Sequence, residues 1–326
     1  MLGAVQDDQL ERAIAVALLR RPRATIGELA LSTGVPRARA RGILSDLVTS
    51  RRVQVSGFLN QRSEGHTLEA AFYLSAAPSA LKRIAAHLLD APAVTTASLL
   101  AGPCSVMAEG YFPSEAAVAE FVAEDLGRIS GLAAVETALY QRRLEIPNRW
   151  QAIVSDPGST RATLDELDRS IVAELSRDGR VSTTTIAVRA GVSEGAVRKR
   201  LARLQATGQL LITAIIDPQL LGHRCEAFLL ISVEPGRLSE AADRLATAPE
   251  TGNVSLMAGR FPLLVRAYFP TPEAITEFVA GSVGQIPGIR AVEIWRVLLR
   301  LRRAFLPLPD AAAWLGRGTT SPSTVD

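Results

Sequence analysis

One stretch of the sequence, residues 193–208, carries cations at the spacing of a helix. At 100° per residue, one stripe of this helix is apolar and is formed by Val197, Leu201 and Leu204. Gly195, Lys199 and Arg203 point the opposite way. A small start and a basic outer face suit approach to base edges and contacts to phosphates or guanine. The residues predicted to contact DNA here are Ser193, Arg198, Lys199, Arg200 and Arg203.

A related stretch, residues 36–49, carries three arginines that are predicted to contact DNA in the same manner: Arg37, Arg39 and Arg41. Its outward face also holds Gly42 and Asp46. A glycine inside a helix costs about 1 kcal/mol relative to alanine, and an aspartate repels phosphate. This stretch is therefore predicted to bind DNA less well than residues 193–208, or in a different register.

Signals for two shorter helices precede each basic stretch. Asp165, Ser182 and Ser193 are suitable N-caps, and Gly191-Val192 is a tight turn before the basic stretch. In the earlier copy, Thr25-Ile26-Gly27-Glu28 has the form of a capping box and Gly34-Val35 is the turn. Three helices with a glycine turn before the third predict a helix-turn-helix in each copy. The alternative is a small helical bundle whose charged face is only solvated.

The two copies belong to an internal duplication with a constant offset of 157 residues. Tyr111-Phe112-Pro113-Ser114 recurs as Tyr268-Phe269-Pro270-Thr271, and Gly34-Val35 recurs as Gly191-Val192. One ungapped offset along most of the chain predicts two tandem repeats of the same fold.

The second part of each repeat alternates predicted strands and helices in the order βαββαβ, which is typical of a ferredoxin-like half-sandwich. In the second repeat, the expected strands are 227–234, 254–258, 263–269 and 289–301, and the expected helices are 238–248 and 271–285. Helices cover only one face of such a sheet. The other face needs a partner, and the second repeat supplies one in the same chain.

The fold class is therefore predicted to be α+β, with two helix-turn-helix (winged-type) DNA-binding units that are each followed by a ferredoxin-like domain. The predicted domains are 1–55 (first helix-turn-helix), 56–150 (first ferredoxin-like domain), 151–163 (linker), 164–212 (second helix-turn-helix), 213–306 (second ferredoxin-like domain, for effector binding or oligomerisation) and 307–326 (disordered tail).

Composition narrows the function classes. The chain has 326 residues, with 36 Lys+Arg, 33 Asp+Glu and only two cysteines, so neither a disulfide framework nor a four-cysteine zinc site is available. The basic excess is confined to the two helix-turn-helix windows, which favours a polyanion-binding surface. The sequence lacks a signal peptide and any apolar run near the roughly 20 residues that span a bilayer, so a cytoplasmic protein without membrane contact is expected.

Several of these motifs together resemble the Lrp/AsnC (feast/famine) family of transcription regulators. They are Leu164-Asp165-Glu166-Leu167-Asp168-Arg169, Asp178-Gly179-Arg180, Ala190-Gly191-Val192-Ser193 and Arg198-Lys199-Arg200-Leu201. The resemblance implies an N-terminal helix-turn-helix, a hinge strand at Ile215-Ile216-Asp217-Pro218, and a C-terminal (RAM/AsnC-type) domain that dimerises and often binds an amino acid. Family members usually carry one such unit, whereas this chain resembles two units fused in tandem.

The resemblance also marks an effector loop of the form Gly-x-x-Asp. The matching segments are Gly102-Pro103-Cys104-Ser105 and Gly259-Arg260-Phe261-Pro262, and neither keeps the acid that would bind an ammonium group. Arg260 could instead favour an anionic ligand, or be an ordinary loop arginine, and the glycines could mark plain hairpin turns. The effector residues predicted on this basis are Gly102, Met257, Gly259 and Arg260.

The resulting hypothesis is a sequence-specific regulator of transcription that binds double-stranded DNA, responds to a small-molecule effector such as an amino acid or related metabolite, and forms homo-oligomers. No enzyme activity, cofactor or metal is expected, since no catalytic motif or metal-ligand spacing is present. The alternative is a tetrapyrrole enzyme, because sirohaem decarboxylases share this build and also occur as two-unit fusions. The sequence has neither paired histidines nor a Trp-Phe-Thr segment to support that alternative.

Overall fold

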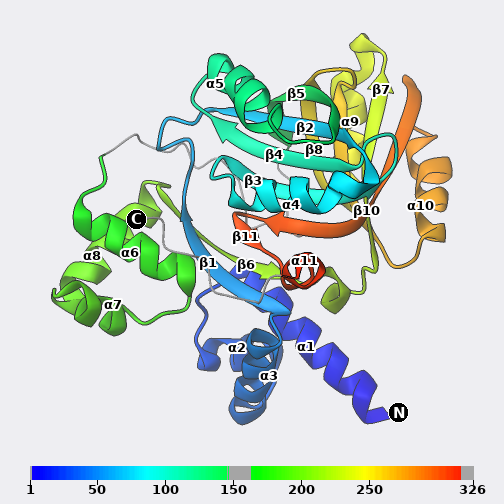
Figure 1. Cartoon of the computed structure of the whole chain (residues 1–326). Helices are drawn as coiled ribbons and strands as arrows, with labels where there is room; N and C mark the ends of the chain where they lie inside the picture. Colours follow the sequence, from blue (N-terminus) through cyan, green and yellow to red (C-terminus); the bar gives the residue numbers. More distant parts are fainter. Residues whose placement is uncertain (1, 145, 147–162, 317–326) are drawn as a thin grey trace. The chain divides into compact units, whose positions relative to one another are not determined.

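The computed structural model describes residues 2–144, 146 and 163–316, and these form two compact units (Figure 1). The first, here called the reader unit, comprises residues 1–65 and 150–221. The second, here called the sheet unit, comprises residues 66–149 and 222–326. Each unit therefore takes one part from each repeat. Nearly all of the predicted linker 151–163 lies outside the described residues.

The first repeat contributes three helices and one strand to the reader unit: α1 (Leu2–Arg20), α2 (Ile26–Thr33), α3 (Arg37–Thr49) and β1 (Val53–Leu59). The predicted capping box at the start of α2 is present, because the Thr25 hydroxyl accepts from the Glu28 amide at 3.2 Å and the Glu28 carboxylate accepts from the Thr25 amide at 2.8 Å. Gly34 ends α2 with a φ of 71°, a left-handed conformation that favours glycine. This is the predicted turn before the third helix.

The second repeat contributes the equivalent elements: α6 (Glu166–Arg177), α7 (Thr183–Ala190), α8 (Glu194–Ala206), β6 (Leu210–Ile216) and a 3₁₀ turn (Pro218–Leu221). Asp165, Ser182 and Ser193 cap the three helices, as the sequence predicted. Gly191 ends α7 with a φ of 67°. Both copies therefore form the predicted helix-turn-helix.

A two-stranded antiparallel ladder joins the two helix-turn-helix domains. β1 pairs with β6 from Val53 opposite Ile216 to Leu59 opposite Leu210. Each strand also packs against helices of the other repeat: α6 of the second repeat lies against β1 of the first, and α1 of the first lies against β6 of the second. The core of the first domain is completed by residues of the second repeat, namely Ala214, Ile216, Leu220 and Leu221. Neither domain therefore has a complete core without the other repeat.

The sheet unit contains two βαββαβ halves, as predicted. The first half has β2 (Leu68–Ala76), α4 (Leu81–Asp90), β3 (Val94–Ala101), β4 (Val106–Phe112), α5 (Glu115–Glu120) with a π-helical extension (Phe121–Leu126), and β5 (Leu132–Leu144). The second half has β7 (Cys225–Val233), α9 (Leu238–Thr247), β8 (Thr251–Ala258), β9 (Leu263–Phe269), α10 (Glu273–Phe278) with a π-helical extension (Val279–Val283), and β10 (Ile289–Arg303). Short 3₁₀ turns (Pro78–Ala80 and Pro235–Arg237) precede α4 and α9.

The two halves close into one continuous antiparallel sheet. β5 pairs with β8 and β10 pairs with β3, while β10 also pairs with β7, so the ladder returns to its start. The uncovered faces of both halves meet inside and form one apolar cluster, which includes Tyr73, Tyr140, Phe228, Met257 and Trp295. The second repeat thus covers the face that the first leaves open, as the sequence predicted.

The end of the chain differs from the predicted disordered tail. Residues 306–315 form a short strand β11 (Leu306–Pro307) and a helix α11 (Pro309–Leu315). Ala311 is buried and Trp314 packs against the core of the first half, with the Lys82 ammonium 5.5 Å from the Trp314 ring centre. The polar, glycine-containing composition beyond residue 315 led to the whole segment 307–326 being predicted as disordered, although its first part contains this short apolar helix. Residues from 317 onward lie outside the described residues.

Candidate nucleic-acid interface

The outer face of α8 presents two of the predicted DNA-binding cations to solvent. Arg198 is 69% exposed and pairs along the helix with Glu194 at 2.7 Å. Lys199 is exposed and makes no ion pair with any residue that the structure describes. Ser193 is exposed at the start of the helix, and its hydroxyl accepts from the Ala196 amide at 3.2 Å. Arg198 and Lys199 are therefore available to a polyanion.

Arg200 and Arg203 turn toward α6 and are only partly exposed. Arg203 lies 2.5 Å from the Asp168 carboxylate, whose side chain is only 1% exposed, and Arg200 lies 2.6 Å from Asp165. Asp165 and Asp168 are also the two members of the α6 capping box. These arginines therefore bind the first helix of the domain to its third, so Arg203 is held in an ion pair whereas Lys199 is not. Four residues advance a helix by 40° beyond a full turn, and the long Arg203 side chain spans the remaining distance to Asp168.

On α3, the predicted cations have different surroundings. Arg41 is exposed, and Arg37 is exposed with its guanidinium near Gly27 of α2. Arg39 pairs with Asp7 of α1, with both side chains about half exposed. Asp46 is exposed on the same helix. The α3 surface therefore carries fewer unpaired cations than its three arginines predict.

Two equivalent arginines clasp the helix-turn-helix domains together. Arg23 and Arg180 are separated by the repeat offset of 157 residues. Arg23 donates to the carbonyls of Gly179 and Val181 at 2.7 and 2.9 Å. Arg180 donates in return to the carbonyls of Pro22 and Ala24, both at 2.7 Å. Each domain thus holds the loop between the first two helices of the other, and we name this arrangement the arginine clasp.

The surroundings of the arginine clasp leave little room for movement. Desolvation by burial lowers the pKa of both Arg23 and Arg180, although Asp178 opposes the shift. A Cβ on Gly179 would lie 2.7 Å from the Ser56 amide nitrogen and the Val55 carbonyl carbon, which no side chain tolerates. The Gly179 amide also donates to the Val55 carbonyl at 2.8 Å. Sequence reasoning missed this contact, although the matched positions of Arg23 and Arg180 in the two repeats were a usable signal.

The predicted effector loops of the sheet unit have close packing around their glycines. A Cβ on Gly102 would lie 3.0 Å from the Trp295 ring, and one on Gly259 would lie 2.7 Å from the Ala138 Cβ. Ala138 and Trp295 are themselves repeat equivalents on β5 and β10. The last strand of the other half therefore leaves no room for a side chain at Gly259 and only tight room at Gly102.

The other two predicted effector residues, Met257 and Arg260, differ in their surroundings. Met257 is buried in the apolar cluster of the closed sheet. Arg260 is about half exposed and lies between two carboxylates, Glu136 at 3.4 Å and Glu293 at 3.3 Å. Glu136 and Glu293 are repeat equivalents, one from each half. Arg260 is thus paired with one glutamate from each half while about half of its side chain remains exposed.

Among the described residues, no group of three or more His, Cys, Asp or Glu side chains is placed to hold a metal ion. The same residues include no helix with the length and apolarity that a membrane span requires.

Comparison with protein families identifies both kinds of domain. Residues 164–205 match the AsnC-type helix-turn-helix domain. Residues 71–148 and 226–304 both match the Lrp/AsnC ligand-binding domain, once in each repeat.

The curated relatives match less than half of this chain. The HTH-type transcriptional regulator FL11 of Pyrococcus horikoshii is 33% identical over 139 residues, which cover 42% of this chain and 91% of the relative. The HTH-type transcriptional regulator LrpA of Mycobacterium tuberculosis is 37% identical over 107 residues, which cover 32% of this chain and 71% of the relative. A solved structure of the siroheme decarboxylase NirDL aligns with 94% of this chain and 97% of its own, with a TM-score of 0.63 at 14% identity. At that identity the likeness is one of fold.

Proposed function

Because the chain belongs to the Lrp/AsnC family of transcription regulators, we propose that one chain reads two unlike DNA half-sites through α3 and α8. The arginine clasp is the observation that carries this proposal. It ties two helix-turn-helix domains of one chain into a pseudo-symmetric pair, which is the arrangement that a two-half-site operator requires.

In the second helix-turn-helix domain, α8 enters the major groove with its small N-terminal residues toward the base edges. Arg198 and Lys199 then contact phosphates or guanine, and the exposed Gln205 lies further along the helix. Arg200 and Arg203 position α8 by binding α6, so they act indirectly.

In the first helix-turn-helix domain, Arg37 and Arg41 are the cations that contact the duplex, while Asp7 neutralises Arg39. Asp46 opposes contact with phosphate on this side. Because the two helix-turn-helix domains carry different charges, we expect two different half-sites, of which the one bound by α8 contributes more of the affinity.

We propose that an effector of this chain binds at Arg260, beside Gly102, Met257 and Gly259. A zwitterionic amino acid fits the charges there, since its carboxylate can pair with Arg260 while Glu136 and Glu293 bind its ammonium group. Those two glutamates then replace the acid that both Gly-x-x-Asp loops lack. Thermal-shift measurements with single amino acids test this proposal: a stabilising ligand should lose its effect in E136Q/E293Q, and the absence of any stabilising amino acid would contradict it.

The DNA proposal is tested by recovering genomic fragments that the purified full chain binds, and by hydroxyl-radical footprinting on the tightest of them. We expect two protected segments about one helical turn apart with unlike sequences, and K199A should weaken protection at only one of them. A single protected segment, or two identical ones, would contradict the proposed division between α3 and α8.

Light scattering on the same preparation gives the oligomeric state, for which we propose association of two or more chains.

We further propose that the chain is not a tetrapyrrole enzyme, although NirDL shares its fold. The closed sheet of this chain is filled by large side chains such as Tyr73 and Trp295, whose rings pack edge to face at 4.9 Å. Titration of the full chain with iron porphyrin, followed by absorbance, should leave the Soret band as it is in buffer. A saturable shift of that band would favour the enzyme alternative.

A further inference from the structure

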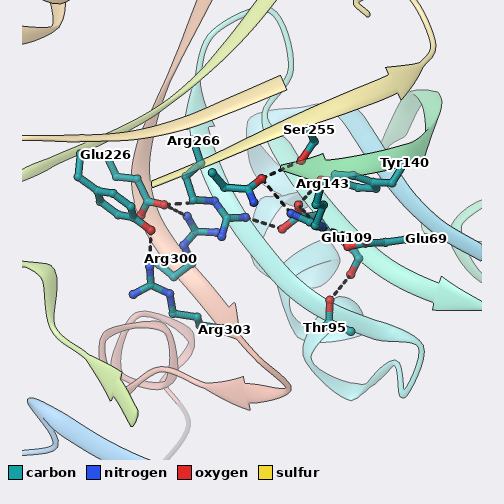
Figure 2. Close-up of polar contacts among 12 residues, drawn as sticks. Glu69, Thr95, Glu109, Tyr140, Arg143, Glu226, Ser255, Arg266, Arg300 and Arg303 are labelled. Carbon is teal, nitrogen blue, oxygen red and sulfur yellow. Dashed lines mark hydrogen bonds and ion pairs between the residues drawn. The ribbon is translucent and has the colours of Figure 1, made fainter. Parts of the chain in front are cut away.

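The closed sheet brings two repeat-equivalent residues into direct contact. Glu109 on β4 and Arg266 on β9 are separated by the offset of 157 residues, and Arg266 donates to the Glu109 carboxylate at 2.6 Å (Figure 2). Both side chains are buried, with exposures of 3% and 8%. A residue that touches its own equivalent lies on the pseudo-twofold axis that relates the repeats. In this protein, the two residues on that axis have opposite charges.

The ion pairs around the axis are the same in both halves, unlike the axial position itself, where one half has Glu109 and the other has Arg266. Glu69 pairs with Arg143 within the first half, and their equivalents Glu226 and Arg300 pair within the second half (Figure 2). Duplication thus retained the flanking ion pairs in both halves. Of these three buried pairs of repeat equivalents, the axial one alone combines an acid in one half with a base in the other.

The Glu109 carboxylate of the axial pair is well compensated in its buried setting. Burial would raise the pKa of Glu109, but Arg266 and then Arg143 outweigh it and hold that pKa at about 2. Tyr140 donates a further hydrogen bond to the same carboxylate. Glu109 is therefore charged at neutral pH, and its largest stabilising charge comes from Arg266 of the other half.

Pairing of like halves would lose this compensation. Two first halves would place two Glu109 carboxylates against each other on the axis, and two second halves would do the same with two Arg266 guanidinium groups. Each axial group would keep only the more distant partner in its own half, Arg143 at 3.4 Å from Glu109 or Glu226 at 3.7 Å from Arg266. An excess of one charge in a protein interior is strongly destabilising. Complementary charge at a single buried position is a known means of selecting one partner over another.

We propose that Glu109 and Arg266 make the two halves of the sheet unit selective for each other, so that the sheet closes only between a first half and a second half. The opposite half comes from the same chain or, by reciprocal exchange, from a second copy of this chain. This inference goes beyond the proposed DNA binding, because it concerns the partner that each half accepts and holds whether or not the chain binds DNA.

The test uses charge reversal in the full chain with two different affinity tags. R266E places two carboxylates on the axis and E109R places two guanidinium groups there, so each variant alone should lose most of its soluble yield or about 10 °C or more in Tm. When the two variants are co-expressed, Glu109 of one chain can meet Arg266 of the other, and the two substituted positions form a reversed pair. We expect soluble protein that carries both tags in equal amounts.

A matched control uses the ion pair within one half. R300E and E226R disrupt a pair that is also largely buried, with side-chain exposures of 8% and 11%. Both partners belong to the second half, so co-expression of these two chains should not restore solubility. The proposal is overturned if R266E and E109R retain the Tm of the parent chain. It is also overturned if their co-expression recovers no more two-tag protein than the control pair, or if the control pair recovers as well.

Discussion

Lys199 and Arg203 lie four residues apart on α8, but their replacement should affect different properties: R203A should lower stability, and K199A should weaken the salt dependence of DNA binding. Arg203 pairs with Asp168, which is almost fully buried. Breaking such a pair costs about 3–5 kcal/mol when the remaining charge has no other partner. Arg203 is itself 36% exposed, and Arg200 remains 3.4 Å from Asp168, so we expect R203A to lower the free energy of unfolding by about 2 kcal/mol.

Lys199, in contrast, has no ion pair among the described residues, and K199A should change stability by less than about 0.5 kcal/mol. If Lys199 contacts a phosphate, its loss should reduce the slope of log affinity against log salt by about 0.9. Between 50 and 200 mM salt, that slope corresponds to about a 3.5-fold smaller loss of affinity than the parent chain shows.

The two variants are compared by urea denaturation and by fluorescence-anisotropy titration of a bound DNA fragment at four salt concentrations. D168N/R203A is the matched control, because removing both charges should recover part of the stability that R203A loses. The reasoning is refuted if R203A unfolds like the parent chain while its salt slope falls, since Arg203 would then contact DNA. A salt slope that does not change in K199A would remove Lys199 from the interface.

Three further expectations follow from buried groups. The double variant R23M/R180M should lose about 2 kcal/mol or more of stability by urea denaturation, because four backbone carbonyls lose charged donors, and in gel shifts it should bind a two-half-site fragment no better than a single half-site. Burial, aided by Glu136, raises the pKa of Cys104 to about 12, so iodoacetamide at pH 8 should modify Cys104 only after denaturation, as followed by peptide mass spectrometry. The depressed pKa of Glu109 contributes stability that is complete above pH 4.5 and is lost as the pH falls toward 2, so the difference in urea midpoint between the parent chain and E109Q should shrink over that range.

Local signals in the sequence predicted the fold well. The caps at Thr25, Asp165, Ser182 and Ser193 depend on contacts three residues away, and the structure has each of them where the sequence places it. The duplication predicted that a second half would cover the open sheet face. These features are visible because their partners are near in sequence or repeat at one offset.

Contacts between the repeats were harder to predict. The closed sheet depends on pairing β5 with β8 and β10 with β3, and no local pattern specifies which edge meets which. Likewise, nothing near Arg203 in sequence shows that Asp168, 35 residues earlier, will occupy its guanidinium. The clasp between Arg23 and the loop at Gly179 joins segments more than 150 residues apart. For this reason, the residue types of the candidate interface were predictable, but their availability to DNA was not.

The exchange of strands in the reader unit has a consequence for biosynthesis. The first helix-turn-helix is translated early, yet its core includes Ala214, Ile216, Leu220 and Leu221. At about 5–20 residues per second, a ribosome takes roughly ten to thirty seconds to travel from β1 to those positions. During that interval the nascent first domain exposes an unfinished apolar surface, so chaperone occupancy on ribosome-bound chains should be greatest before residue 221 emerges and should fall once it has.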